Sequence, residues 1–293
     1  MNTMTGNTVQ ASLSDRWDHH ARTYQQIAAP CTGYLAQSLF QSVAGRLPTD
    51  ALILDIACGG GELARAAALH TLADGREAGG RGHVVATDFS PQMVERTRRL
   101  LEATCPEAHV DCIVRDGQAL GFDTASFDAA FSAFGIFLFP DRKTGWREAA
   151  RVLRPGGWFA TAVWRGPEHN ALAREQVAPI LSALPASIRE AIPQPGWLEI
   201  STAEGLAAEV AAAGFTDVEV SVFDAVFTAP TSRAMWEMAL QNPPMQPLFA
   251  ALGKERLATV EQSVVSTFER RAGGVDRPLR LDCSCHFLVA RRA

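Results

Sequence analysis

A turn of three glycines after an apolar segment is the feature of this sequence best suited to chemistry. Residues 52–61 (LILDIACGGG) end in Gly59, Gly60 and Gly61, and Asp55 lies within the apolar part. Glycine tolerates a positive φ and lets a ligand approach the main chain without a Cβ in the way. The free N–H groups at the start of the following helix carry a positive partial charge that suits a carboxylate. We therefore predict a ligand site at this turn, with Asp55 suited to a cationic group of the ligand.

Dinucleotide binding is the nearest alternative for such a turn. Its G-x-G-x-x-G fingerprint requires a third glycine, and that position is Ala64 in this chain. The acid at Asp55 also stands before the turn, where it suits a cation better than a pyrophosphate. A nicotinamide oxidoreductase is therefore disfavoured, and a strand, turn and helix without a ligand remains the other alternative.

Two further acids follow the next two apolar segments. Asp88 stands just before Ser90, where its carboxylate can accept hydrogen bonds from both hydroxyls of a ribose or act only as a helix cap. Asp116 can accept a hydrogen bond from an exocyclic amine such as that of adenine, or serve only as a turn residue. Phe89 and Met93 can enclose an adenine ring or belong to the core. Together these residues favour a cofactor that contains a nucleoside.

The elements that must position these residues alternate between strand and helix. Strands are predicted at 51–57, 83–87, 109–114, 127–132, 158–163, 216–223 and 281–290, with helices at 61–72, 90–104, 143–153 and 202–213. Ser90 followed by Pro91 is a strong helix start, because serine caps and proline fits the first helical position. Strands spaced by helices predict an α/β fold with a parallel sheet covered on both faces. Cofactors in such sheets lie beyond the carboxyl ends of the strands.

Five segments, in order and spacing, resemble the motifs of class I S-adenosylmethionine-dependent methyltransferases. They are residues 54–61, 86–93, 116–122, 126–129 and 151–157, within residues 50–164. Their style is most similar to the branch that contains ubiquinone and menaquinone C-methyltransferases and many natural-product enzymes. The resemblance implies a Rossmann-like, mostly parallel sheet of seven strands in the order 3-2-1-4-5-7-6, with the last strand antiparallel. Residues 281–290 are the candidate for that last strand.

The resemblance also implies S-adenosylmethionine as the cofactor and assigns residues to it. Asp55 and the backbone of Ala57 and Gly59 would hold the methionine end, and Ser132 with Ala133 would face that end and the substrate. The whole set of implied cofactor residues is Asp55, Ala57, Gly59, Gly61, Asp88, Phe89, Met93, Asp116, Gly117, Gln118 and Ser132. One position departs from the family pattern: Ala57 replaces the first glycine of D-x-G-x-G-x-G. We therefore expect residue 57 to avoid a positive φ.

Methyl transfer from a sulfonium is an in-line displacement, so that positioning of the reactants supplies much of the rate. A base is needed only if the acceptor must lose a proton. Candidate bases are His169, His19, His20 and Tyr24, each with a surface role as the alternative. Candidate substrate-binding residues are Trp17, Phe134, Phe137, Trp164, Trp197 and Trp236. Such an aromatic set suits a small, largely apolar or aromatic acceptor, and no acids or imidazoles stand at metal-binding spacing.

The charge and the apolar content of the sequence disfavour some classes of binding partner. It has 293 residues with 27 basic and 32 acidic side chains, a net charge of −5, which disfavours nucleic acid and anionic membrane surfaces. No segment approaches the roughly 18–20 apolar residues that span a bilayer, and the sequence starts without a signal-peptide pattern, so that a cytoplasmic location is expected. The six cysteines lack zinc-site spacing and are expected to be free thiols.

We expect one domain with additions. The predicted parts are an N-terminal helical cap at 1–45, a cofactor-binding core at 46–165, helical substrate-cap additions at 166–200 and 231–275, and the remainder of the sheet at 201–230 and 276–293. The additions exceed what a cofactor fold needs and favour a transferase of specialised metabolism. A quinone-precursor C-methyltransferase and a non-catalytic protein that binds S-adenosylmethionine remain the alternatives.

Overall fold

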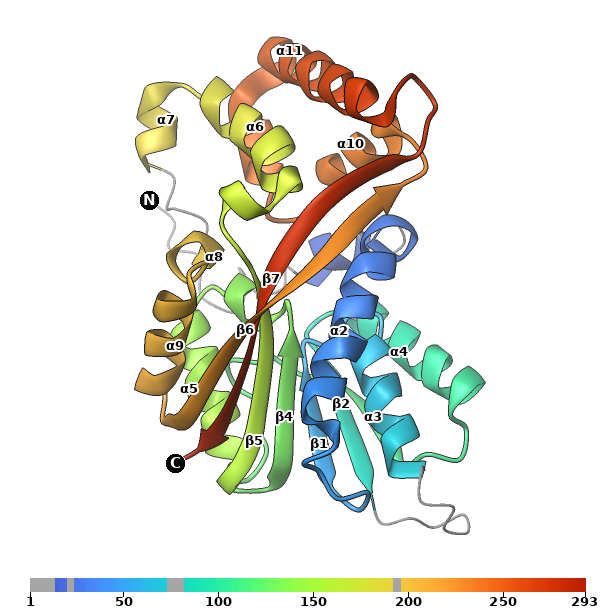
Figure 1. Cartoon of the computed structure of the whole chain (residues 1–293), viewed down its shortest axis with the longest axis vertical. Helices are drawn as coiled ribbons and strands as arrows, with labels where there is room; N and C mark the ends of the chain where they lie inside the picture. The colour runs from blue at the N-terminus through green and yellow to red at the C-terminus, as the bar shows by residue number, and fades with distance from the viewer. Residues whose placement is uncertain (1–13, 20–23, 73–81, 192–195) are drawn as a thin grey trace. The chain divides into compact units, whose positions relative to one another are not determined.

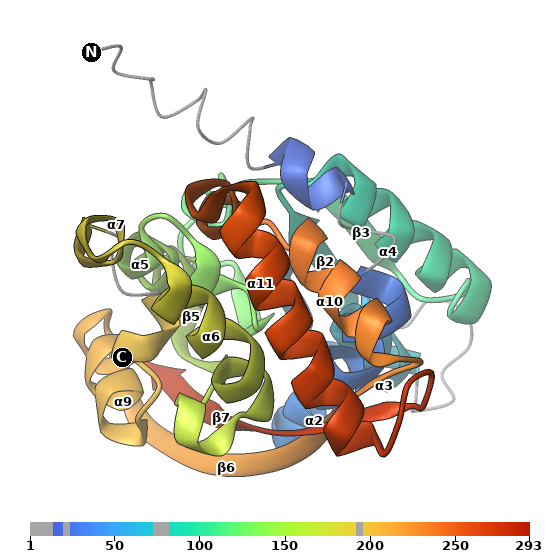
Figure 2. The same ribbon diagram turned by 90° about the horizontal axis from the view of Figure 1, so that it is seen from above.

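The chain forms two compact units, each built from several segments (Figures 1 and 2). The computed structural model describes residues 14–19, 24–72, 82–191 and 196–293. One unit comprises residues 32–164, 196–223 and 285–293, and we call it the sheet unit. The other unit comprises residues 1–31, 165–195 and 224–284, and we call it the helical unit. Of the predicted N-terminal cap, residues 1–13 and 20–23 lie outside the described residues.

A seven-stranded sheet organises the fold, in the order β3-β2-β1-β4-β5-β7-β6. The strands are β1 (Leu52–Ile56), β2 (His83–Asp88), β3 (Val110–Val114), β4 (Phe127–Ala133), β5 (Leu153–Trp164), β6 (Phe215–Ala229) and β7 (Leu279–Arg292). Strands β1 to β5 pair in parallel, and β7 pairs antiparallel with β5. The predicted order and the antiparallel last strand are confirmed. Both β6 and β7 are longer than predicted and run from the sheet unit into the helical unit.

Helices cover both faces of the parallel strands, as their apolar composition requires. Ile53, Leu54 and Ile56 in β1 are fully buried although they point to opposite faces. Figures 1 and 2 show α2 (Ala29–Ala44), α3 (Glu62–Leu72) and α4 (Pro91–Thr104) on one face, with α5 (Arg142–Val152) and α9 (Ala203–Ala212) on the other. The layered arrangement leaves the carboxyl ends of β1 to β4 at one edge.

The start of α4 forms as predicted. The Ser90 hydroxyl accepts a hydrogen bond from the Met93 N–H at 3.1 Å, and Pro91 occupies the first helical position. Such a cap stabilises a helix by about 1 kcal/mol. The buried face of α4 is formed at helical spacing by Met93, Val94, Thr97 and Leu101. This packing holds the start of α4 close to the end of β2.

The helical unit contains several helices, the C-terminal end of β6 and the N-terminal end of β7. Its helices include α6 (Ala178–Ala183), α7 (Ala186–Ala191), α10 (Ser232–Gln241) and α11 (Gln246–Ala272). Pro243 and Pro244 lie between α10 and α11, where proline cannot continue a helix. Trp236 and Phe268 are fully buried and anchor its core. Among the described helices, none combines the length and the hydropathy that a membrane span requires.

Candidate functional site

The glycine turn after β1 adopts the conformation that its composition allows. Gly59 and Gly61 have φ values of 55° and 92°, in the region that glycine enters at no steric cost. The turn is tied to the neighbouring strand, because the Cys58 N–H donates to the Thr87 carbonyl at 2.9 Å. The N–H of Gly59 donates to Asp88 Oδ2 at 3.0 Å. The structure therefore brings the glycine turn into direct contact with Asp88, the last residue of β2.

Ala57 also has a left-handed backbone, with φ of 58°. The prediction that this residue avoids a positive φ is wrong. The conformation costs a non-glycine residue roughly 1–2 kcal/mol, so the surrounding packing must hold it. A Cβ placed on Gly135 would lie 2.5 Å from the Ala57 Cβ, which shows how closely the main chain after β4 approaches this side chain. The turn geometry and this close packing override the local preference of alanine.

A second strained residue lies at the end of the neighbouring strand. Phe134 directly follows β4 and has φ of 60°. Its ring stacks on Trp164 at the end of β5, with centroids 4.2 Å apart and an interplanar angle of 24°. Strained backbone persists where the structure over-determines it, commonly at functional sites. Strain at the ends of both β1 and β4 therefore marks this edge of the sheet.

Asp55 is a buried acid that lacks a full set of partners. Its side chain is 1% exposed, and its Oδ2 has no hydrogen-bond partner among the described residues. Burial raises the pKa of Asp55 from 3.8 to about 8; the Ala64 backbone N–H opposes this rise, while Asp88 and Glu62 add to it. A buried carboxylate oxygen without a partner is costly. It fits a cationic or hydrogen-bonding group of a ligand, which would favour the ionised form.

Each carboxylate oxygen of Asp88 accepts a hydrogen bond from a main-chain N–H. Its Oδ1 accepts from the Ser90 N–H at 2.9 Å and its Oδ2 from Gly59. The capping role considered as the alternative is therefore real. Each carboxylate oxygen has a second lone pair, so that ribose binding stays compatible and remains a prediction. Phe89 is half-buried and Met93 is buried beside it.

The segment after β3 forms a tight turn around Asp116. Its Oδ1 accepts from the Gln118 N–H at 2.9 Å and from Gln118 Nε2 at 3.1 Å. Gly117 has no room for a side chain, because a Cβ there would lie 2.4 Å from the Phe139 ring. The turn role of Asp116 is thus present, and its predicted contact with an adenine amine stays a prediction.

Ser132 lies at the end of β4 and is fully buried. Its hydroxyl accepts from the Ile136 N–H at 3.2 Å, and its carbonyl accepts from the Thr161 hydroxyl at 2.8 Å. The first bond ties Ser132 to the short helical turn Ile136–Leu138, in which Phe137 is also buried, and the second joins β4 to β5. The structure gives Ser132 a positioning role for this turn; its predicted contact with the cofactor remains untested.

Two residues of this edge escaped the sequence analysis. Thr97 in α4 is fully buried, and its hydroxyl donates to the Gly59 carbonyl at 3.0 Å. Its side chain also fills the space next to Gly61. Burial raises the pKa of Glu62, which begins α3 next to Gly60. The helical spacing of Thr97 with Met93 and Leu101 could have indicated that Thr97 is buried. Nothing in the sequence distinguishes Glu62 from an ordinary acid in the first turn of a helix.

The predicted substrate and base residues divide between the two units. The sheet unit contains Phe134, Phe137, Trp164 and Trp197, the last in α8 (Gly196–Glu199). The helical unit contains Trp17, His19, Tyr24, His169 and Trp236. Trp236 is fully buried in α10 and packs edge-on against Phe249. His19 is exposed, Tyr24 is half-buried, and His20 lies outside the described residues.

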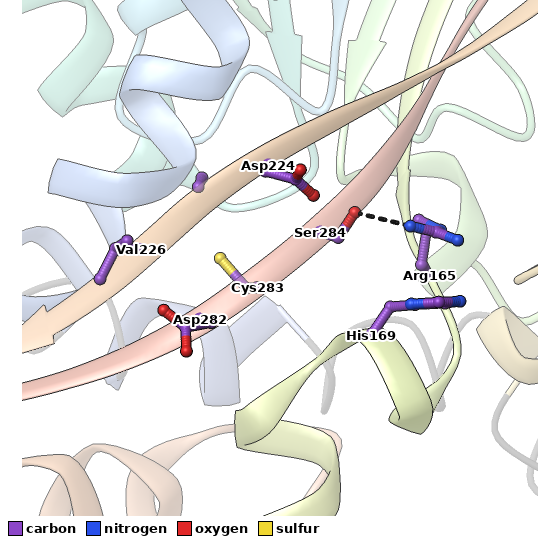
Figure 3. Close-up of a pocket in the computed structure, with 8 residues that line it drawn as sticks. Arg165, His169, Asp224, Val226, Asp282, Cys283 and Ser284 are labelled. Carbon is purple, nitrogen blue, oxygen red and sulfur yellow. Dashed lines mark hydrogen bonds between the residues drawn. The ribbon is translucent and has the colours of Figure 1, made fainter.

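An open cavity of about 380 Å³ lies within the helical unit (Figure 3). It is lined by Arg165, His169, Asp224, Ala225, Val226, Asp282, Cys283 and Ser284. Figure 3 shows Arg165 and His169 across from residues of the two strands, and Arg165 Nη1 donates to the Ser284 hydroxyl at 3.2 Å. One predicted base, the exposed His169, therefore lines the same cavity as Arg165, Asp224 and Asp282.

Comparison with known proteins identifies relatives that match a large part of the chain. Residues 53–157 match the family described as "Methyltransferase domain". Methyltransferase ktnA of Aspergillus niger is 29% identical over 210 residues, covering 64% of this chain and 67% of that protein. The demethylmenaquinone methyltransferase of Staphylococcus aureus is 31% identical over 181 residues, covering 58% and 70%. The 2-phytyl-1,4-naphtoquinone methyltransferase of Trichormus variabilis is 30% identical over 117 residues, covering 40% of this chain and 48% of that protein.

Solved structures share the fold at lower identity. The YcgJ protein of Bacillus subtilis aligns with a TM-score of 0.56 at 15% identity, covering 88% of this chain and 98% of that one. A protein from Bacillus halodurans C-125 aligns with a TM-score of 0.55 at 18% identity, covering 87% and 97%. These two alignments show a common fold.

Proposed function

The chain belongs to the class I S-adenosylmethionine-dependent methyltransferases, and we propose that it methylates a small, largely apolar or aromatic acceptor. The net charge of −5 supports a small molecule over a nucleic acid. The helical segments at 166–200 and 231–275 exceed what a cofactor fold needs, which supports a dedicated acceptor and a role in specialised metabolism.

The observation that carries the cofactor site is the buried Asp55 beside the glycine turn, whose Oδ2 has no hydrogen-bond partner among the described residues. S-adenosylmethionine presents an ammonium and a sulfonium, and either would compensate this carboxylate. The Gly59 and Asp88 pair places a main-chain turn and a second acid at the same edge. The residues present therefore fit the cofactor of the family.

When bound, the cofactor supplies an electrophilic methyl group on sulfur. The chain's part in our proposal is mainly positioning: Asp55 holds the methionine end, Asp88 the ribose, and the turn around Asp116 the adenine. The stacked rings of Phe134 and Trp164 offer π faces that attract a cation and exclude water from an apolar acceptor. His169, His19 and Tyr24 are our candidates to accept a proton where the acceptor must lose one.

A quinone precursor is the second candidate acceptor. It is favoured by the names of two relatives, a demethylmenaquinone methyltransferase and a 2-phytyl-1,4-naphtoquinone methyltransferase. Such a molecule also meets the requirement for an aromatic, largely apolar acceptor. The two candidates therefore share this chemistry and differ only in the ring system and in the atom that is methylated.

An acceptor screen with isotopically labelled S-adenosylmethionine tests the proposal. Small phenols and indoles form one panel and reduced naphthoquinones the other, with the methylated product identified by mass spectrometry. We expect label transfer to at least one panel, and exclusive transfer to a ring carbon of the naphthoquinones would select the second candidate. Cofactor binding without transfer to either panel would contradict the proposed acceptor class.

A further inference from the structure

Two cysteines that are distant in the sequence meet inside the helical unit. Cys31 lies in the first turn of α2 and Cys283 on β7, 252 residues apart, yet their Sγ atoms are 3.7 Å from each other. Both side chains are buried, at 5% and 3% exposure. A disulfide needs an S–S distance near 2.05 Å, so the two sulfurs must approach by only about 1.7 Å.

One cysteine of this pair lies in the wall of a cavity. Cys283 lines the open cavity of the helical unit, between Asp282 and Ser284, whereas Cys31 is not among the lining residues (Figure 3). The cavity of about 380 Å³ is large compared with a peroxide or a small thiol. We therefore infer that a peroxide reaches Cys283 first and that Cys31 is the second thiol of the pair.

The surroundings of Cys283 favour its thiolate. The hydrogen bond with the Cys31 thiol lowers the pKa of Cys283 below its ordinary value, and the Phe227 backbone adds to this, although burial, Asp282 and Asp224 oppose it. Burial instead raises the pKa of Cys58 well above its ordinary value and that of Cys112 to about 11. The thiolate is the reactive form of cysteine. Cys58 and Cys112 are therefore expected to react more slowly with a peroxide than Cys283.

We propose that Cys31 and Cys283 form an oxidisable dithiol that a hydroperoxide converts to a disulfide. The Cys283 thiolate attacks one oxygen of the hydroperoxide, the O–O bond breaks, and the other oxygen leaves and takes up a proton as an alcohol or water. The Cys31 thiolate then attacks Cys283 Sγ, the S–O bond breaks, and hydroxide leaves and is protonated to water. Two electrons pass from the two sulfurs to the peroxide, and a small-molecule thiol reverses the reaction by exchange.

The disulfide would join the N-terminal segment to β7. That segment includes the turn Tyr24–Ala28, which contacts α10, and the candidate residue Tyr24. A covalent link over so long a stretch of chain restricts the unfolded state strongly. Oxidation is therefore expected to raise the thermal unfolding midpoint and to restrain the segment that carries Tyr24.

Peptide mapping of the peroxide-treated, folded protein tests the proposal. Free thiols are alkylated after treatment, the protein is digested at arginine and lysine, and linked peptides are identified. Cys31 is the sole cysteine between Arg22 and Arg46, whereas Cys283 and Cys285 share the segment between Arg280 and Arg291. The Cys285→Ser variant therefore serves both to assign the link and as the matched control. We expect a loss of about 2 Da, the mass of two hydrogens, and one link, between the Cys31 and Cys283 peptides, in wild type and Cys285→Ser alike.

The Cys31→Ser variant should lose this link and instead accumulate a sulfenic acid at Cys283 that a dimedone probe traps. A thiol reductant should restore both alkylatable thiols in the wild type. A link between any other pair, or no link in wild type and Cys285→Ser under conditions that oxidise the unfolded chain, would overturn the proposal. The wild-type map decides the question even if the Cys31→Ser variant does not fold.

Discussion

In the sheet unit, the predicted cofactor residues all lie at or just beyond the carboxyl ends of β1 to β4. In the helical unit, the predicted acceptor and base residues come from separate segments, with Trp17 and Tyr24 near the N-terminus, His169 after β5 and Trp236 in α10. Parallel strands bring their ends to one edge by construction, so short local motifs suffice there. No such rule gathers residues from scattered helices, and each must be placed by packing.

The largest expected effect tests the helical side of this comparison. For an acceptor that loses a proton on methylation, His169→Ala should lower kcat by about 10²–10⁴-fold if His169 is the base. The affinity for S-adenosylmethionine should not change, because the predicted cofactor residues all belong to the sheet unit. Steady-state kinetics beside a cofactor titration measures both quantities. An unchanged kcat would remove His169 from the proposed machinery.

Asp55 should make the sheet unit less stable as the pH rises. Its pKa of about 8 in the folded protein lies above the ordinary 3.8, so between about pH 4 and 8 the folded state keeps a proton that the unfolded state has released. Stability from this group is therefore present at low pH and lost as the pH rises towards 8. Asp55→Asn does not titrate, and near pH 8 without cofactor it should exceed wild type by several kcal/mol.

Urea unfolding of the two proteins at pH 5, 6.5 and 8 checks this expectation. The difference in the free energy of unfolding should grow with pH, while Asp55→Asn should bind S-adenosylmethionine more weakly. A difference that stays constant with pH would show that Asp55 is ionised throughout, and that the carboxylate is compensated within the protein itself.

The smallest expected effect concerns the left-handed residue of the turn. Ala57→Gly removes a backbone cost of about 1–2 kcal/mol but adds freedom to the unfolded chain worth about 0.5–1 kcal/mol. We expect a net stabilisation of about 0.5–1 kcal/mol in thermal or urea unfolding. Ala208→Gly, at an exposed position in the middle of α9, is the matched control and should destabilise by about 1 kcal/mol. Equal destabilisation by both changes would mean that Ala57 is not strained.

The sequence was sufficient for the sheet and its edge because the controlling patterns are local. Alternating strands and helices predicted the α/β class, the family motifs implied the strand order, and Ser90 with Pro91 predicted the start of α4. The conformation of Ala57 could not be predicted, because it depends on the close approach of Gly135, 78 positions further along. The helical spacing of Thr97 with Met93 and Leu101 indicates that Thr97 is buried, but no local pattern shows that its hydroxyl reaches the Gly59 carbonyl.

Packing in the helical unit was harder to predict from the sequence, because it also depends on contacts between distant residues. The contact of Cys31 with Cys283 joins residues 252 positions apart, and cysteine spacing gives no hint of it. The continuation of β6 beyond Phe223 and the early start of β7 at Leu279 likewise depend on pairing between strands that are far apart in the chain. Non-local contacts of this kind leave no periodic signal in the sequence.

The central claim, that S-adenosylmethionine binds at the edge formed by the glycine turn and Asp88, is tested most directly by calorimetric titration. S-adenosylmethionine and its demethylated product would be titrated into wild type, Asp88→Ala and Asp111→Ala. Asp111 is the matched control, an exposed acid on β3 whose partner is His83. We predict binding to wild type and Asp111→Ala with equal affinity, and a loss of about 1.5–3 kcal/mol, roughly 10- to 150-fold, in Asp88→Ala. Equal affinity in all three proteins, or no binding to wild type, would contradict this account.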